Sequence, residues 1–306
     1  MVRPRFAHYS RAQAQYERAL LTWMRRVSDV IYRTLEPHLD SLTRMDSDEQ
    51  LAFDFSGALN VLQSQLPNML DVDQARTLVF AIGQKMADEH KKSVSVSIRD
   101  RLSSRNKPKI ERIDLFQIEP WIQPAMNQWT DQNVALITRM PQLLLQNAAQ
   151  IVKEAAPGGM RHETLAKRLK DALAVPDSSA RLIARDQMAK WNSSLTTERL
   201  TRAGITKARW RTSRDRRVVG TPGGTYPVAK SPDKHGNHYE REGRLFLVGR
   251  VPLVEVLPNG RQIVHPEWND GEPGHGIQCR CWWEMYVDEL DDLLDNTPAP
   301  LEMGGG

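Results

Sequence analysis

The chain has 306 residues, of which 40% are hydrophobic and 26% charged, and its formal net charge is +4, values typical of a soluble globular protein with room for two domains. No apolar run reaches the roughly 18 residues of a membrane-spanning helix, and Met1–Phe6 lacks the apolar core of a secretory signal, so no membrane partner is expected. The two cysteines, Cys279 and Cys281, are one residue apart and would close a strained ring, which excludes a disulfide scaffold.

Amphipathic helices are predicted in the first two thirds of the chain. From Ser10 to about Leu35 apolar residues recur at steps of three and four, and this stripe is expected to stop at Pro37. It would serve either the protein's own core or a partner. The alternation at Ser93–Ile98 fits either a short strand or a weak helix end. Further helices are predicted at 46–67, from 71 or 73 onwards, at 120–140, at 142–156 after a break at Pro141, at 162–173 and at 177–203.

The C-terminal part changes character, because glycine and proline become frequent and short alternating segments appear. The predicted fold class is α+β: a mainly helical N-terminal domain, then long helices leading into a small antiparallel sheet. Residues 1–157 form the expected helical docking domain, 160–290 the second domain, and 291–306 an acidic, disordered tail. Strands are predicted at 207–213, 245–248, 261–264 (after a Pro258–Gly260 turn) and 281–287.

Four motifs follow one another in the second domain. They are a capped helix reading Ser179-Ala-Arg-Leu-Ile-Ala-Arg-Asp-Gln-Met-Ala189, a tryptophan strand followed by Asp215-Arg-Arg-Val218, His238-Tyr-Glu-Arg-Glu-Gly-Arg-Leu-Phe246, and Pro273-Gly-His-Gly-Ile-Gln-Cys-Arg-Cys281. Each motif alone has little specificity. The order of all four resembles the phage Mu protein F-like head morphogenesis family over about residues 160–287.

Two features depart from that family's pattern. Asp186-Gln187 stands where many members have Thr-Glu, and a Gly/Pro-rich loop from Gly220 to Gly236 lengthens the spacing before His238.

The resemblance implies a minor capsid protein of a tailed bacteriophage, without enzymatic activity. It also implies association with the portal protein and contact with capsid or scaffold proteins during head assembly or DNA delivery. The expected location is the capsid interior of the virion, after synthesis in the host cytoplasm.

Basic residues are unevenly distributed, and this favours a polyanionic partner. Non-specific double-stranded DNA is the expected polyanion, because phosphate contacts need no base readout. A solvated surface is the alternative interpretation of any one basic cluster. The candidate phosphate contacts are Arg209, Arg211, Arg214, Arg216 and Arg217.

The paired cysteines allow two interpretations. Isolated thiols are most often simply buried, and Cys-x-Cys on a regular strand directs its thiols to opposite faces, so two core cysteines are favoured. If the segment turns, thiolate and imidazole donors fit a structural zinc site that would stabilise a small sheet. Its candidate ligands are His238, His275, Cys279 and Cys281.

The alternative function is a metal-dependent nuclease of the His-Asn-His type, because His235, His238, His265 and His275 crowd the C-terminal region. Such a motif needs a helix to hold its second metal ligand. The residues between His265 and His275 include two prolines and two glycines and do not favour that helix.

Overall fold

A computed structural model of the chain combines six α-helices with one five-stranded antiparallel sheet in its described residues, which confirms the predicted α+β class. None of the described helices is long and apolar enough to cross a membrane. The structure describes residues 10–42, 48–69, 71–103, 119–155, 162–174, 176–212, 238–268, 270–276, 279 and 281–286.

The chain divides into two compact units. A helical unit comprises His8–Glu89 and Ile118–Met188, and a sheet unit comprises Met1–Ala7, His90–Gln117 and Ala189–Gly306. The helices are α1 (Ser10–Leu42), α2 (Asp48–Met69), α3 (Val72–Ser103), α4 (Ile122–Ala155), α5 (His162–Ala174) and α6 (Pro176–Arg202).

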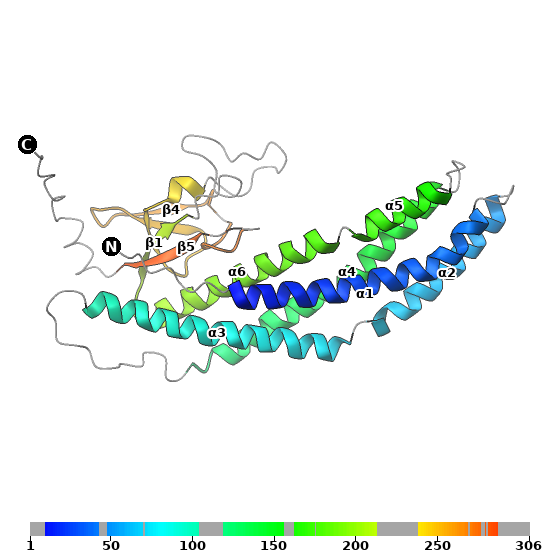
Figure 1. The fold of residues 1–306 in the computed structure, drawn as a ribbon. Helices are drawn as coiled ribbons and strands as arrows, with labels where there is room; N and C mark the ends of the chain where they lie inside the picture. Colours follow the sequence, from blue (N-terminus) through cyan, green and yellow to red (C-terminus); the bar gives the residue numbers. More distant parts are fainter. Residues whose placement is uncertain are drawn as a thin grey trace, which may run out of the picture. The chain divides into compact units, whose positions relative to one another are not determined.

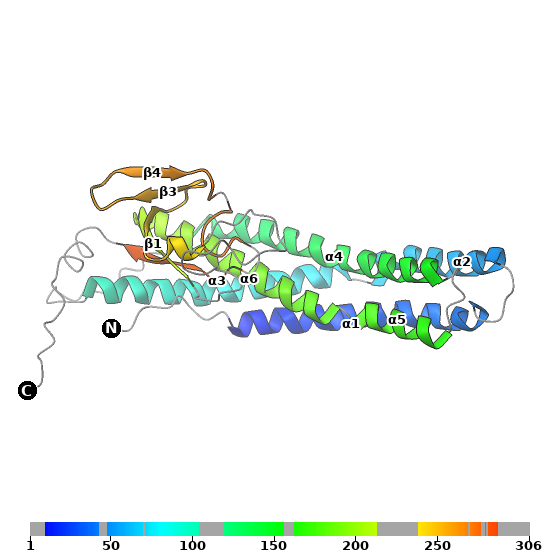
Figure 2. The ribbon, with the colours of Figure 1, turned by 90° about the horizontal axis from the view of Figure 1, so that it is seen from above.

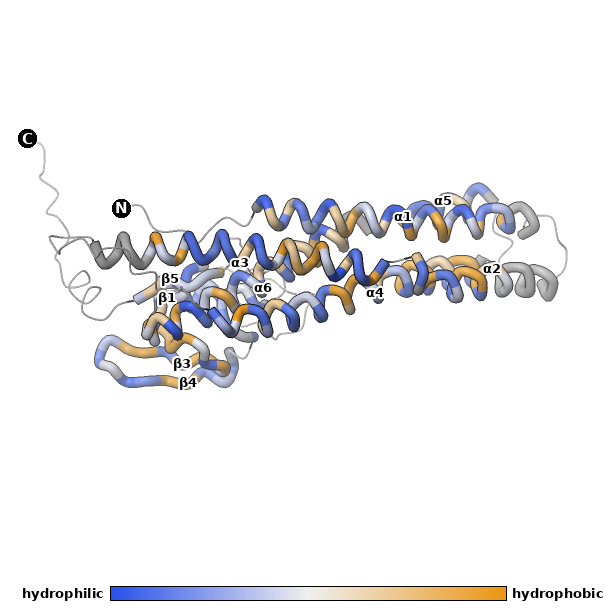
Figure 3. The backbone as a smooth tube through the Cα atoms, turned by 90° about the horizontal axis from the view of Figure 1, so that it is seen from below, coloured by the Kyte–Doolittle hydropathy of each residue, from blue (hydrophilic) through white to orange (hydrophobic). Residues whose placement is uncertain are grey.

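In the helical unit, α1, α2, α4 and α5 run side by side (Figures 1 and 2). Their apolar faces are buried in one core. Tyr16, Leu20, Ile31 and Leu35 of α1 have no exposed surface, so the α1 stripe belongs to the protein's own core and is not a free docking face. Orange and blue stretches alternate along α1 and α4 in Figure 3, as expected for helices with one buried face.

The two predicted proline breaks are wrong. α1 continues through Pro37 to Leu42, and α4 continues through Pro141. A proline inside a helix costs about 3 kcal/mol. The apolar stripe persists across it, however: Leu35 and Leu39 flank Pro37 with no exposed surface. Each such side chain gains about 1.5–3 kcal/mol on burial, which offsets the cost.

The alternating segment Ser93–Ile98 is helical, because α3 runs unbroken to Ser103. Val94 lies in the core of the sheet unit, and the Ser97 hydroxyl donates to the Ser93 carbonyl 2.9 Å away within the helix. His90, at the start of this stretch, is also buried and contacts the Thr196 hydroxyl at 2.8 Å. Long-range packing therefore decides between the two alternatives.

The sheet has the strand order β4-β3-β2-β1-β5. Figure 2 shows the β3–β4 hairpin at one edge. Strand β1 lies between β2 and β5 and pairs with β5 from Lys207↔Tyr286 to Arg211↔Trp282, and its alternate residues Ala208 and Trp210 are buried. The strands are β1 (Lys207–Arg211), β2 (Leu245–Leu247), β3 (Leu253–Val256), β4 (Gln262–His265) and β5 (Trp282–Tyr286).

Strand β3 has no counterpart among the predicted strands. Three of its four residues are buried, among them the charged Glu255. The predicted turn after Pro258 is present: Gly260 has a φ of 81°, and its amide donates to the Leu257 carbonyl at 2.8 Å.

The division into units differs from a boundary near residue 157. α5 belongs to the helical unit because Leu165, Leu169 and Leu173 pack into the helical core. The segment His90–Gln117 and the residues from Ala189 onwards belong to the sheet unit. The predicted acidic tail, 291–306, lies outside the described residues.

Candidate metal centre

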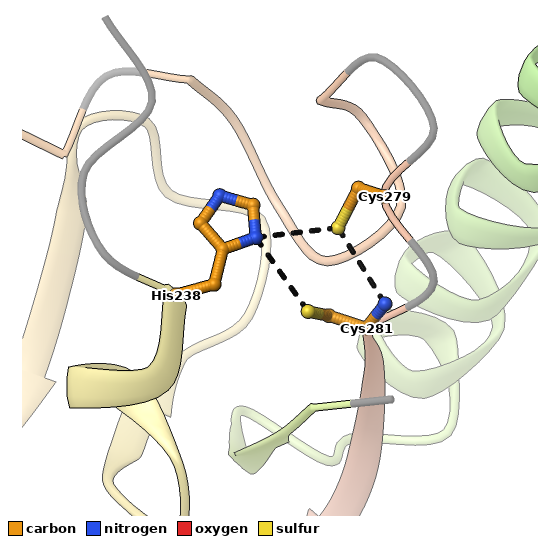
Figure 4. A group of neighbouring side chains, drawn as sticks. All are labelled: His238, Cys279 and Cys281. Carbon is orange, nitrogen blue, oxygen red and sulfur yellow. Dashed lines mark hydrogen bonds between the residues drawn. The ribbon is translucent and has the colours of Figure 1, made fainter. Parts of the chain in front are cut away.

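Three sequence-predicted ligands come together in the sheet unit. His238 begins the short 3-10 helix η2 (His238–Arg241), while Cys279 and Cys281 lie in the segment directly before β5. In Figure 4, the imidazole nitrogen Nδ1 points toward both sulfur atoms. Residues separated by about forty positions in the sequence thus meet because η2 and the start of β5 flank the same sheet core.

The three donor atoms form a compact group. His238 Nδ1 lies 3.4 Å from Cys279 Sγ and 3.6 Å from Cys281 Sγ. All three donors lie within 4.8 Å of one another, and all three residues are buried. Thiolate and imidazole donors gathered in this way can bind a metal ion.

Cys279 and Cys281 both lie outside the regular strands, since β5 begins only at Trp282, and both thiols contact His238. The Cys281 amide donates to Cys279 Sγ at 3.5 Å, and the Gly274 amide donates to the same sulfur at 3.4 Å. Two backbone amides thus donate to the Cys279 sulfur, and the opposite orientation expected for thiols on a regular strand does not apply to these two cysteines.

The second imidazole nitrogen also has a buried partner. His238 Nε2 donates to Asp270 Oδ2 at 2.5 Å, and Asp270 Oδ1 lies 2.8 Å from the Arg241 guanidinium. That guanidinium has no exposed surface and lies over the rings of Trp210 and Trp268, 4.8 Å and 5.0 Å from their centroids. The histidine is thus held on both sides of its ring.

The local field favours charged forms in this cluster. Burial alone would lower the pKa of His238, but the hydrogen bonds to Asp270 and Cys279 outweigh it and raise that pKa. Hydrogen bonds from Cys281 and His238 hold the pKa of the Cys279 thiol well below its usual value. For Asp270, burial raises the pKa, and the contacts with His238 and Arg241 reverse this and lower it. A deprotonated thiolate is the form that binds metals.

The fourth predicted ligand, His275, is not in the group. Its Nδ1 lies 3.1 Å from the Ser193 hydroxyl on α6. His265 is engaged elsewhere too, since its two ring nitrogens contact Glu255 at 2.9 Å and Glu267 at 2.8 Å. His235 lies outside the described residues.

The candidate phosphate contacts divide into two sets. Arg211 lies 2.5 Å from Glu284 and 3.3 Å from Glu242, so neighbouring carboxylates balance its charge. Arg209 lies 4.8 Å above the Tyr286 ring and donates to the Gly243 carbonyl at 3.3 Å. Arg214, Arg216 and Arg217 lie outside the described residues.

Sequence reasoning missed the two residues behind His238. Arg241 could have been considered, because it belongs to the motif His238–Phe246 that the sequence singles out. Asp270 gave no signal, because it lies in a loop of turn-forming residues where an aspartate is usual.

Comparison with known proteins adds one relative. A Haemophilus influenzae protein described as "Uncharacterized protein" is 22% identical over 288 residues, covering 94% of this chain and 56% of the relative. The chain therefore spans little more than half of that protein's length. The similarity includes residues of both units. No family model and no solved structure matches the chain.

Proposed function

We propose that this protein is a minor head protein of a tailed bacteriophage, similar to the Mu protein F-like head morphogenesis proteins, and that it is not an enzyme. Its partners are the portal protein, and capsid or scaffold proteins during assembly. It contacts packaged double-stranded DNA non-specifically through basic side chains. Its place is the capsid interior, after synthesis in the host cytoplasm.

The observation that carries the proposal is the packing of the motif residues against one another. Trp210 lies 5.4 Å from the His238 ring and 6.1 Å from the Phe246 ring, measured between centroids. Phe246, Cys279 and Cys281 belong to the same buried cluster as Trp210. Three motifs scattered over about seventy residues therefore specify one core, which supports treating them as the signature of one fold.

The test is co-expression of the full chain with the portal protein encoded in the same phage genome, followed by affinity purification. We expect a stable complex that survives moderate salt. A plasmid-cleavage assay with added divalent metal runs beside it, and we expect intact plasmid.

The opposite pair of results overturns the proposal. If the portal is not retained and the plasmid is cut, with cleavage lost in His238→Ala or His265→Ala, the protein is a nuclease. The second variant separates the two histidine environments, because His265 contacts Glu255 and Glu267 while His238 faces the cysteines.

We further propose that His238, Cys279 and Cys281 hold a structural zinc ion. Their donor atoms fit the metal's preference for sulfur and nitrogen, and the carboxylate behind His238 is the usual partner of a zinc-binding imidazole. Bound zinc would crosslink η2 to the start of β5. The zinc content of the purified protein tests this directly.

A further inference from the structure

The imidazole of His238 is fixed by contacts on both of its nitrogens. Nδ1 faces the sulfur atoms at 3.4 Å and 3.6 Å, and Nε2 lies 2.5 Å from Asp270 Oδ2. A carboxylate oxygen accepts a hydrogen bond from a nitrogen that carries a proton. In the neutral imidazole the hydrogen therefore lies on Nε2, and the lone pair of Nδ1 is directed at the thiols.

The carboxylate of Asp270 is itself paired with the guanidinium of Arg241. The Asp270 side chain is 1% exposed and that of Arg241 is fully buried, with 2.8 Å between carboxylate oxygen and guanidinium nitrogen. This close pair is not aligned as a hydrogen bond, and within the described residues none of the three guanidinium nitrogens has a hydrogen-bond acceptor.

A buried ion pair of this kind contributes little to the stability of the fold. Removing two charges from water costs several kcal/mol per ion, and imperfect geometry recovers only part of that. Apolar residues of similar volume would stabilise the same core at least as well. The same carboxylate contacts Nε2 of His238, so the ion pair lies directly behind that ring.

We propose that Asp270 is a positioning residue that, with Arg241 behind it, selects Nδ1 of His238 as the metal-binding atom. This inference rests on the proposed zinc site. Carboxylate partners of zinc-bound histidines fix the ring and increase its basicity, and their loss typically lowers metal affinity 10- to 100-fold.

The experiment uses three variants of the full chain. Asp270→Asn keeps an acceptor for Nε2 but removes the charge. The double variant Asp270→Leu, Arg241→Met removes both charges, so that no guanidinium is left buried without its partner. The control is Glu267→Gln, which alters an exposed carboxylate nearby in sequence that contacts His265 and not His238.

Two quantities are measured: zinc affinity by chelator competition, and the position of the imidazole proton by nitrogen-15 NMR of the zinc-free protein. We expect the double variant to bind zinc about 10- to 100-fold more weakly, Asp270→Asn to fall between it and wild type, and Glu267→Gln to match wild type. Measured at a pH where the imidazole is neutral, the proton should reside on Nε2 in wild type and be shared between both nitrogens in the double variant.

The outcomes separate this inference from the proposal beneath it. If wild type binds zinc and the affinity and the proton position are unchanged in the Asp270 variants, the positioning role is wrong and the zinc site stands. If wild type binds no zinc, both proposals are wrong. Should the double variant fail to fold by circular dichroism, Asp270→Asn decides, because its amide oxygen can still accept from Nε2 while the lost charge must weaken binding.

Discussion

Both ring nitrogens of His238 contact buried side chains in the sheet unit, whereas those of His265 contact two carboxylates, one of them exposed. The two contacts of His238, sulfur on one side and carboxylate on the other, have the chemistry of a metal ligand with its supporting residue. His275 instead contacts the Ser193 hydroxyl. At the scale of single residues, the structure thus separates one candidate ligand from another of the same type.

This difference provides a matched prediction for zinc binding. We expect about one zinc per chain in wild type and in His275→Ala, and none in His238→Ala, Cys279→Ser or Cys281→Ser. Without the ion, the variants lose the stabilisation from binding, about 2.7 kcal/mol when free zinc is 100-fold above its Kd. Elemental analysis and thermal melting with and without added zinc measure both effects.

Loss of zinc from His275→Ala would return that residue to the ligand set. Retention of zinc in all three ligand variants would place the ion elsewhere in the chain.

At the scale of elements, α3 and α4 approach closely at Gly83. A Cβ atom built at this position would lie 2.8 Å from a ring carbon of Trp129, closer than real Cβ contacts. Trp129 is 5% exposed, and its indole nitrogen donates to the Gln187 carbonyl at 3.3 Å. The ring is therefore not free to move, and the helix contact requires glycine.

We predict that Gly83→Ala destabilises the helical unit. Overpacking costs about 1–3 kcal/mol, and the gain in helix propensity of about 1 kcal/mol recovers only part of it. The control is Gly57→Ala in α2, where nothing lies within 4 Å of the added atom. We expect that variant to be unchanged or more stable by up to about 1 kcal/mol. Urea unfolding of both variants gives the comparison, and equal free energies of unfolding would contradict it.

At the scale of the whole molecule, the net charge of +4 does not show which basic side chains contact DNA, because some of them are paired with carboxylates. Arg211 shows this clearly, since Glu284 and Glu242 both contact its guanidinium. An arginine that is already paired with carboxylates neutralises little phosphate charge, so its contact with DNA releases few counterions from the DNA.

We therefore predict different salt dependences for two sets of variants. Replacing Arg214, Arg216 and Arg217 together with Ala should reduce the slope of log affinity against log salt by up to about 2.7, at about 0.9 for each lost phosphate contact. Arg211→Ala should leave the slope near the wild-type value. Binding to random duplex DNA at several salt concentrations measures both. An unchanged slope in the triple variant would remove this arginine cluster from the proposed DNA contact.

The sequence by itself determined the α+β class, the position of most helices and four of the five strands. Those features follow from local periodicity, which short-range backbone preferences express directly. It also offered His238, Cys279 and Cys281 as candidate ligands together with His275, while favouring two core cysteines, and the structure brings the first three together.

Only the tertiary structure decided the rest. Pro37 and Pro141 stay inside helices, and Ser93–Ile98 is helical, because burial against distant residues outweighs local preference. Tertiary packing also decides that His275 contacts Ser193 and not the cysteines, and that Asp270 contacts His238. These contacts depend on the packing of segments that are far apart in the chain, and no local sequence pattern predicts that packing.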